Sequence, residues 1–135
     1  MDPYLGQINL FGYPWAVTDW AMADGSLVPT SQNEALYALY GTYWSGAGNG
    51  ETNFNLPDLR GRVPMGAGQA GGLTPRVMGD TGGEESVTMG GLAAAASPGS
   101  PVVYASSVPQ MATTPPFLVM SYQVAMEGTF PEQAW

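Results

Sequence analysis

The sequence has no cysteine, no histidine and no lysine, so three arginines supply all of its fixed positive charge. Without cysteine the chain can form no disulfide, thiolate nucleophile or thiolate-ligated metal site. Without histidine it lacks the commonest metal ligand and the commonest general base at neutral pH. Ser-His-Asp and Cys-His nucleophilic arrangements are therefore excluded. We expect a protein that is not an enzyme, with a carboxylate-dependent hydrolase as an alternative.

The scarcity of positive charge also excludes several classes of partner. The formal net charge is −8, whereas nucleic-acid phosphates and anionic membranes attract basic surfaces. No apolar run approaches the roughly 18 residues of a membrane span. The first residues, Met-Asp-Pro-Tyr, resemble no secretory signal peptide. We expect no nucleic-acid partner and no membrane insertion. If the protein is extracellular or virion-associated, we expect release by lysis, a dedicated export system or incorporation into a particle.

Charged residues of both signs are few, at 10% of the chain. The surface of a soluble domain usually contains about 25–35% charged residues. Small polar residues, glycine and tyrosine must therefore cover much of this protein. Such a surface favours burial against copies of the same chain. With 135 residues, the chain is predicted to form one domain over residues 1–135.

The first 64 residues show short extended segments and one helix. Alternating apolar residues predict a strand within Leu5–Phe11, and Asp24-Gly25 predicts a hairpin spanning Trp20–Val28. Ser31 and Glu34 have the spacing of a capping box, and apolar residues follow at helical spacing. The pattern predicts a helix over about residues 32–40, ended by Gly41.

The rest of the chain is irregular until its C-terminal part. Glu85–Met89 is predicted to contain a short strand, and every even position in Leu118–Met126 is apolar, which predicts a half-buried strand. We expect a mainly β fold, α+β with one short helix, long irregular loops and a Gly/Ala/Pro-rich arm. Its parts would be a core over residues 1–89, a low-complexity loop or arm over 90–116, and a closing segment over 117–135.

Two arginines lie between two prolines in Leu56–Pro64, Leu-Pro-Asp-Leu-Arg-Gly-Arg-Val-Pro. In a chain with so few cations, Arg60 and Arg62 are expected to hold carboxylates or backbone carbonyls. Together with Asp58 they could form a ligand-binding patch. We favour a structural clamp, an internal ion pair that also binds carbonyls and holds the loops around the helix.

Leu56–Pro64 resembles the signature of the phage tail collar domain, and especially that of the small microcystin-dependent proteins of bacteria. Further similar segments lie upstream and downstream in the family's order, including Gly6-Gln7-Ile8, Leu27-Val28-Pro29, Ser31-Gln32-Asn33, Glu85-Ser86-Val87-Thr88 and Pro116-Phe117-Leu118. The resemblance spans about 110 of the 135 residues. It implies a non-enzymatic, tail-collar-like component of a fibre.

One departure from the family concerns metal binding. Members often carry a Met-Pro-x-His-x-His type motif after a Val-Thr-Leu segment, and similar histidines bind metal in some tail fibres. Here Val87-Thr88-Met89 is followed by Gly90 and an alanine run. We therefore expect no metal site and no cofactor. Asp80, Glu84 and Glu85 could offer oxygen ligands to Ca²⁺, but a solvated acidic turn is favoured, because their spacing fits no calcium loop.

Aromatic residues are numerous for so small a chain, and three roles are open to them: core, subunit interface and glycan contact. The candidates are Trp15, Trp20, Tyr37, Tyr40, Tyr43, Trp44 and Trp135. We single out Tyr43, Trp44 and Trp135 as possible interface or glycan contacts. Val102, Val103 and Tyr104 join them, because the arm could add a strand to another subunit's sheet edge.

Two hypotheses of function follow. In the first, the protein is a structural subunit that self-associates into a homo-oligomer, an extracellular filament or a tail-fibre-like assembly. In the second, it is an adhesion module of a fibre tip that binds cell-surface carbohydrate. Assembly without any ligand would favour the first hypothesis, and glycan binding by isolated monomers would favour the second.

Overall fold

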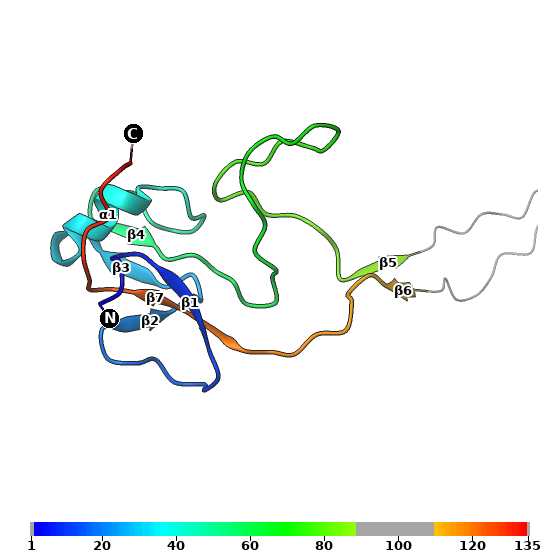
Figure 1. Cartoon of the computed structure of the whole chain (residues 1–135), viewed down its shortest axis with the longest axis horizontal. Helices are drawn as coiled ribbons and strands as arrows, with labels where there is room; N and C mark the ends of the chain where they lie inside the picture. Colours follow the sequence, from blue (N-terminus) through cyan, green and yellow to red (C-terminus); the bar gives the residue numbers. More distant parts are fainter. Residues whose placement is uncertain (1, 89–109, 135) are drawn as a thin grey trace, which may run out of the picture. The chain divides into compact units, whose positions relative to one another are not determined.

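The computed structural model describes residues 2–88 and 110–134 of the chain. They form two compact units: the larger contains the chain up to Asp80 and from Val119 onward, and the smaller is Thr81–Leu118. As expected, the structure is mainly β with one short α-helix (Figure 1). The organisation as one domain stays a prediction.

The main sheet of the larger unit joins the two ends of the chain. Its strands are β1 (Ile8–Phe11), β2 (Trp20–Met22) and β7 (Ser121–Ala125). β7 lies between β1 and β2 and pairs antiparallel with both. The C-terminal strand therefore supplies the centre of a sheet whose two edges come from the first 22 residues.

A second, two-stranded sheet is formed by β3 (Leu27–Pro29) and β4 (Asn53–Asn55). The predicted hairpin over Trp20–Val28 is therefore wrong, because β2 and β3 pair with different partners. Asp24-Gly25 does not fold the chain back on itself. It pairs instead with the segment after β4, through an Asp24–Asp58 bridge and a 3.2 Å hydrogen bond from the Gly25 N–H to the Pro57 carbonyl.

The predicted helix is confirmed, with a later start. A 3₁₀ turn, η1 (Thr30–Gln32), precedes α1 (Glu34–Tyr40). The Ser31–Glu34 capping box is wrong, because Ser31 lies in the 3₁₀ turn and Asn33 occupies the N-cap position without a side-chain cap. Its side-chain amide instead donates to the Pro29 carbonyl at 2.9 Å. Gly41 ends the helix as expected, with a φ of 51°.

The core is small and centres on one face of α1. Leu36 and Tyr40 of this helix pack against Phe54, which lies in β4, and Leu56, which comes directly after β4. Leu5, Ala23 and Val124 complete the buried cluster. The Tyr40 hydroxyl donates to the Gly6 carbonyl at 2.6 Å, so the chain segment before β1 is tied directly to the helix.

The C-terminal strand only partly follows its predicted alternation. Tyr122, Val124 and Met126 pack on the core, as expected for one face of a strand. Leu118 and Met120 are 86% and 44% exposed, because β7 begins only at Ser121 and the preceding residues pair with no strand. The opposite face of β7 is not solvent-exposed either, because Gln123 on that face is completely buried.

The smaller unit contains an antiparallel ribbon of β5 (Ser86–Thr88) and β6 (Gln110–Ala112), with Val87 opposite Met111. The strand predicted within Glu85–Met89 is thus confirmed. All described residues of this unit are exposed. Most of the predicted arm, residues 90–116, lies outside the described residues. Among the residues that are described, the structure contains no helix of the length and apolar character needed to cross a membrane.

The Tyr40 hydrogen bond gives a first prediction. Tyr40→Phe should lower the free energy of unfolding by about 1 kcal/mol at pH 7, because the Gly6 carbonyl loses its donor. Burial raises the pKa of Tyr40 above its ordinary value of 10.0. The tyrosine of the unfolded chain therefore ionises first, so the contribution of Tyr40 is complete below pH 10 and decreases as the pH rises beyond it.

Urea denaturation at pH 7 and at pH 10.5 would test this expectation. Tyr43→Phe is the matched control, because Tyr43 is 53% exposed and its substitution should change stability little. The cost of Tyr40→Phe relative to the native protein should be smaller at the higher pH. Equal stability of both variants at pH 7 would contradict the assigned role of Tyr40.

Candidate binding surfaces

The segment singled out from the sequence, Leu56–Pro64, begins in the core and continues along the Asp24-Gly25 turn. The Leu56 N–H donates to the Ser26 carbonyl and the Leu59 N–H to the Ala23 carbonyl, both at 2.9 Å. Leu56 itself is 1% exposed. The first half of the segment is thus a structural element that joins β4 to the turn between β2 and β3.

The structure brings Asp58, Arg60 and Arg62 together. The Arg60 guanidinium binds the Asp58 carboxylate through two 2.9 Å hydrogen bonds, from Nε and from Nη2. Arg62 donates to the Asp58 backbone carbonyl at 3.2 Å and lies 3.6 Å from its carboxylate. The side chains of Asp58, Arg60 and Arg62 are 32%, 71% and 48% exposed. The cluster therefore lies at the surface and holds its own turn, rather than forming an internal pair.

The ion pair changes the acidity of Asp58. The Arg60 side-chain hydrogen bonds, assisted by the Arg60 backbone N–H and the charges of both arginines, lower the pKa of Asp58 to about 2. Asp58 therefore stays ionised far into the acid range. Because the pair is open to solvent, its contribution to stability is small, and its chief effect is to fix the shape of the turn.

The acidic residues considered for Ca²⁺ do not gather into a metal site. The Asp80 carboxylate accepts the Val77 N–H at 2.8 Å and closes a turn in the larger unit, whereas Glu84 and Glu85 belong to the smaller unit. Across residues 2–88 and 110–134 there is no group of three acidic residues placed to hold a metal ion.

The predicted aromatic contacts have different environments. Tyr43 is 53% exposed, whereas Trp44 is half-buried against the core, with its ring at an edge-on angle to Tyr40, 5.6 Å between centroids. Trp135 and the three arm residues Val102, Val103 and Tyr104 lie outside the described residues. Their proposed role as interface or glycan contacts stays a prediction.

A row of four aromatic rings joins the two edge strands of the main sheet, because Phe11 ends β1 and Trp20 begins β2. We call it the aromatic rail; it consists of Phe11, Tyr13, Trp15 and Trp20. Consecutive ring centroids along the row Trp20–Phe11–Tyr13–Trp15 are 5.1, 5.6 and 5.0 Å apart. Trp15 is 64% exposed and Tyr13 36% exposed, so the rail runs from a half-buried indole to an open one.

The loop that carries Tyr13 and Trp15 is fixed by polar groups of β7. The buried Gln123 side chain donates to the Trp15 carbonyl at 2.9 Å and accepts the Val17 N–H at 3.0 Å. The Ser121 hydroxyl donates to the Tyr13 carbonyl at 2.9 Å. These bonds explain why the face of β7 opposite the core holds a glutamine, since the loop covers it.

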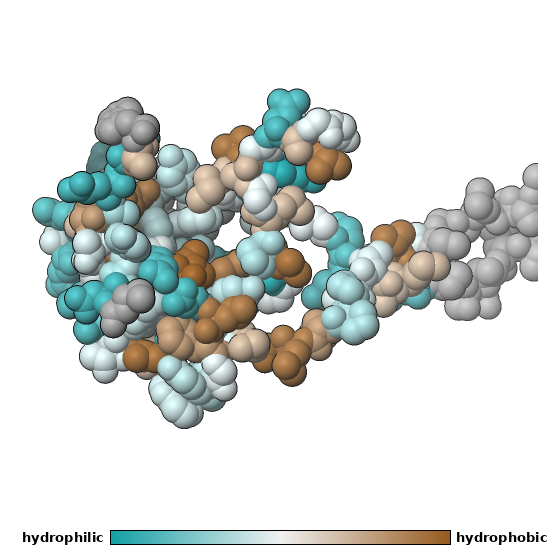
Figure 2. Space-filling view, viewed as in Figure 1, coloured by the Kyte–Doolittle hydropathy of each residue, from teal (hydrophilic) through white to brown (hydrophobic). Residues whose placement is uncertain are grey.

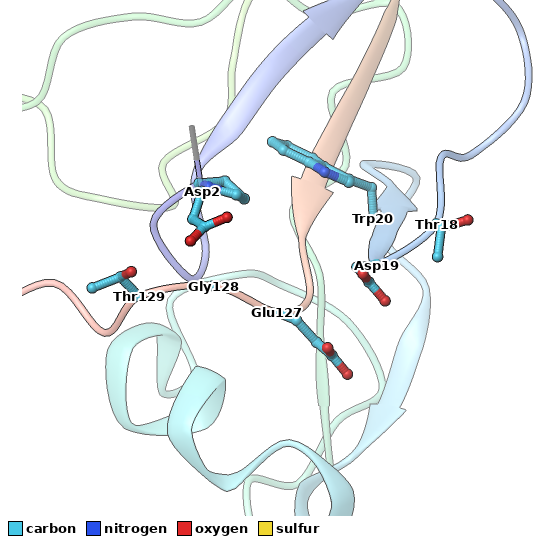
Figure 3. A pocket seen from close by; sticks show the side chains of 8 residues that line it. Asp2, Thr18, Asp19, Trp20, Glu127, Gly128 and Thr129 are labelled. Carbon is cyan, nitrogen blue, oxygen red and sulfur yellow. The ribbon is translucent and has the colours of Figure 1, made fainter.

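An acidic pocket adjoins the inner end of the rail. It has a volume of about 330 Å³ and is lined by Asp2, Pro3, Thr18, Asp19, Trp20, Glu127, Gly128 and Thr129. Figure 3 shows the carboxylates of Asp19 and Glu127 pointing to the same side of the pocket. Gly128 is required here by close packing, because a Cβ at this position would lie 2.3 Å from the Pro3 carbonyl oxygen.

The sequence interpretation counted Trp15 and Trp20 among the aromatic residues but assigned neither to a site. The signal lies in the alternation Phe11, Tyr13, Trp15, which continues the period of β1 beyond its last residue. The pocket has no local signal, because it brings together residues near positions 2, 19 and 128. Only the pairing of β7 with β1 and β2 places them side by side.

These features define a small β-rich unit with one short helix. The family model described as the phage tail collar domain matches residues 6–64. This match, over less than half of the chain, supports the resemblance found in the sequence for residues 6–64. Domains of this family are structural parts of phage tails. No curated protein and no solved structure matches the chain.

The Asp58 turn gives a second prediction. In a carboxyl NMR titration, Asp58 should titrate near pH 2 in the native protein, and Arg60→Gln should raise its pKa toward the ordinary value of 3.8. The depressed pKa stabilises the fold above pH 3.8, and this contribution is lost as the pH falls toward 2. Arg62→Gln is the control and should shift the pKa less. An unchanged Asp58 pKa in Arg60→Gln would show that the pair does not form in solution.

Proposed function

We propose that the protein is a structural subunit that self-associates, into a homo-oligomer or an extracellular filament of the tail-fibre type. The observation that carries this proposal is the distribution of apolar side chains. Among the described residues, eighteen large apolar side chains are exposed and only eight apolar residues are buried. Monomeric soluble proteins rarely expose large contiguous apolar patches, and a second copy of the chain would cover such surface.

One stretch of the larger unit concentrates these residues. We call residues 63–78 the apolar loop. It exposes five large side chains by 50–84%: Val63, Met65, Leu73, Val77 and Met78. Figure 2 shows apolar side chains of this kind, in brown, at the surface. The loop has a defined shape, because Gly68 and Arg76 exchange two backbone hydrogen bonds of 2.7 and 2.9 Å.

The apolar loop is also suited to association by its charge. A net charge of −8 makes copies of the chain repel one another, so a contact must use surface with few carboxylates. Residues 63–78 contain no acidic residue and a single charge, Arg76. Arg76 would thus attract an acidic neighbouring copy, while the surrounding apolar side chains become buried in the contact.

The β5–β6 ribbon offers a second contact region. It has two strands of three residues each, and an isolated ribbon of this kind is marginally stable in water. Val87 and Met111, which face each other across it, are 46% and 57% exposed. Among the described residues neither strand has a partner on its outer edge, to which a strand of another copy could be added. This supports the predicted role of the 90–116 arm, which stays a proposal.

The tail collar family supports the same function, since its members have a structural role in phage tails. An extracellular or virion-associated location follows from this proposal, as does the absence of enzymatic activity. Association with a geometry that does not close would give a filament, and a closed arrangement would give a discrete oligomer.

The apolar loop can be tested directly. Leu73→Ser combined with Val77→Ser should weaken association about tenfold or more, because two exposed side chains lose their contacts in the contact region. The measurement is mass by light scattering over a dilution series, with electron microscopy of the same samples. Leu27→Ser is the matched control, because Leu27 is 46% exposed but lies outside the apolar loop.

The native protein should be larger than its 14.1 kDa chain, and only the double variant should dissociate at higher concentration. A native protein of monomer mass at all concentrations would overturn the proposed function. Equal effects of the double variant and Leu27→Ser would overturn the assignment to the apolar loop.

A further inference from the structure

We propose that the aromatic rail and the acidic pocket form one binding site for an uncharged or amino-substituted saccharide. The rings would pack against the C–H faces of sugar rings, and the carboxylates would accept hydrogen bonds from hydroxyl or ammonium groups. The two features meet at Trp20, which belongs to the rail and also lines the pocket. A ligand could therefore contact both at once.

The fixed backbone beneath the exposed rings is the first argument. The Gln123 side chain is 0% exposed and makes three hydrogen bonds, to the Trp15 carbonyl, the Val17 N–H and the Ser121 hydroxyl. A buried polar network of this kind fixes the loop but leaves Trp15 and Tyr13 at the surface. Groups held in place before binding lose little conformational entropy when the ligand arrives.

The arrangement of the rings is the second argument. Tyr13 and Trp15 stack with an interplanar angle of 21° and 5.0 Å between centroids, so each ring covers part of one face of the other, and the 64% exposed Trp15 leaves its remaining surface to a ligand. Phe11 lies edge-on to Trp20, at an angle of 76°, and Trp20 also lines the pocket. Exposed tyrosine and tryptophan rings combine apolar faces with an O–H or N–H group at the edge, which suits contacts with amphipathic ligands.

Charge selects the class of ligand. Three carboxylates line the pocket, from Asp2, Asp19 and Glu127, and none of the three arginines lines it. Ionised carboxylates only accept hydrogen bonds, so the ligand must be rich in donors and cannot carry several negative charges. The hydroxyls of Thr18 and Thr129 add groups that both donate and accept. A polyhydroxylated ring meets these requirements, whereas sialylated, sulfated or uronic glycans would be repelled.

The size of the pocket agrees with this assignment. Ligand pockets typically measure about 300–1,000 Å³, and a volume of about 330 Å³ lies at the small end of that range. The pocket would accommodate the end of a chain of sugars, while the following rings lie along the rail. The site would therefore favour an oligosaccharide over a single sugar.

The test is a glycan array with the full native chain, including neutral, amino-sugar and anionic oligosaccharides, followed by calorimetry with the glycan that binds most tightly. We expect binding to neutral or amino-sugar glycans only. Trp15→Ala should weaken it about tenfold or more. Asp19→Asn should weaken it several-fold, because the substitution removes a carboxylate charge from the pocket. Asparagine tolerates the φ of 68° at this position, so the backbone should keep its conformation.

Tyr43→Ala is the matched control, because Tyr43 is an exposed aromatic residue outside the rail. The glycan affinity of this variant should stay within about twofold of the native value, a much smaller loss than the substitution of a main contact residue causes. The proposal is overturned if no glycan binds, if only anionic glycans bind, or if lysine- or arginine-rich peptides bind in place of the sugars. It is also overturned if Trp15→Ala and Tyr43→Ala change the affinity equally. It is also overturned if Trp15→Ala changes the size of the assembly, since the rail would then be a contact between copies. Light scattering on the same samples separates this outcome from a failure of the proposed self-association.

Discussion

The insertion of β7 between β1 and β2 is the constraint on which the rest of the larger unit depends. Its two faces have different tasks: Val124 closes the core beneath the sheet, and Gln123 holds the loop that covers the opposite side. The same pairing brings residues near positions 2, 19 and 128 together around the acidic pocket. Core, aromatic rail and pocket are thus consequences of one five-residue strand.

The sequence predicted those elements whose causes are local. The helix that ends at Gly41, the strand around Val87 and the apolar face of Tyr122 and Val124 all follow from short-range periodicity and turn chemistry. The hairpin at Asp24-Gly25 was wrong because its local preference was outweighed by pairing with Asp58 and Pro57, more than thirty residues away in the chain. The pocket could not be predicted at all, because no local pattern indicates which distant segments a central strand will bring together.

The distribution of apolar side chains links the fold to its proposed use. A helix of seven residues and a few short strands bury a modest cluster, and the free energy available from so small a core is limited. The apolar surface left outside it, above all on residues 63–78, would contribute to stability only when another copy covers it. Folding stability and assembly would then depend on the same concentration of protein. The hydrogen bonds of Gln123 behind Trp15 do not depend on a second copy, because all their partners lie within one chain.

The order of the strands also has a consequence for synthesis. The two edge strands of the main sheet are translated first, but their shared partner is Ser121–Ala125. Neither β1 nor β2 has a backbone partner in this sheet until about a hundred further residues have been made. The main sheet can therefore close only after Ser121–Ala125 has left the ribosome. Until then the edges of β1 and β2 that β7 pairs with stay open, and non-local pairing of this kind slows folding.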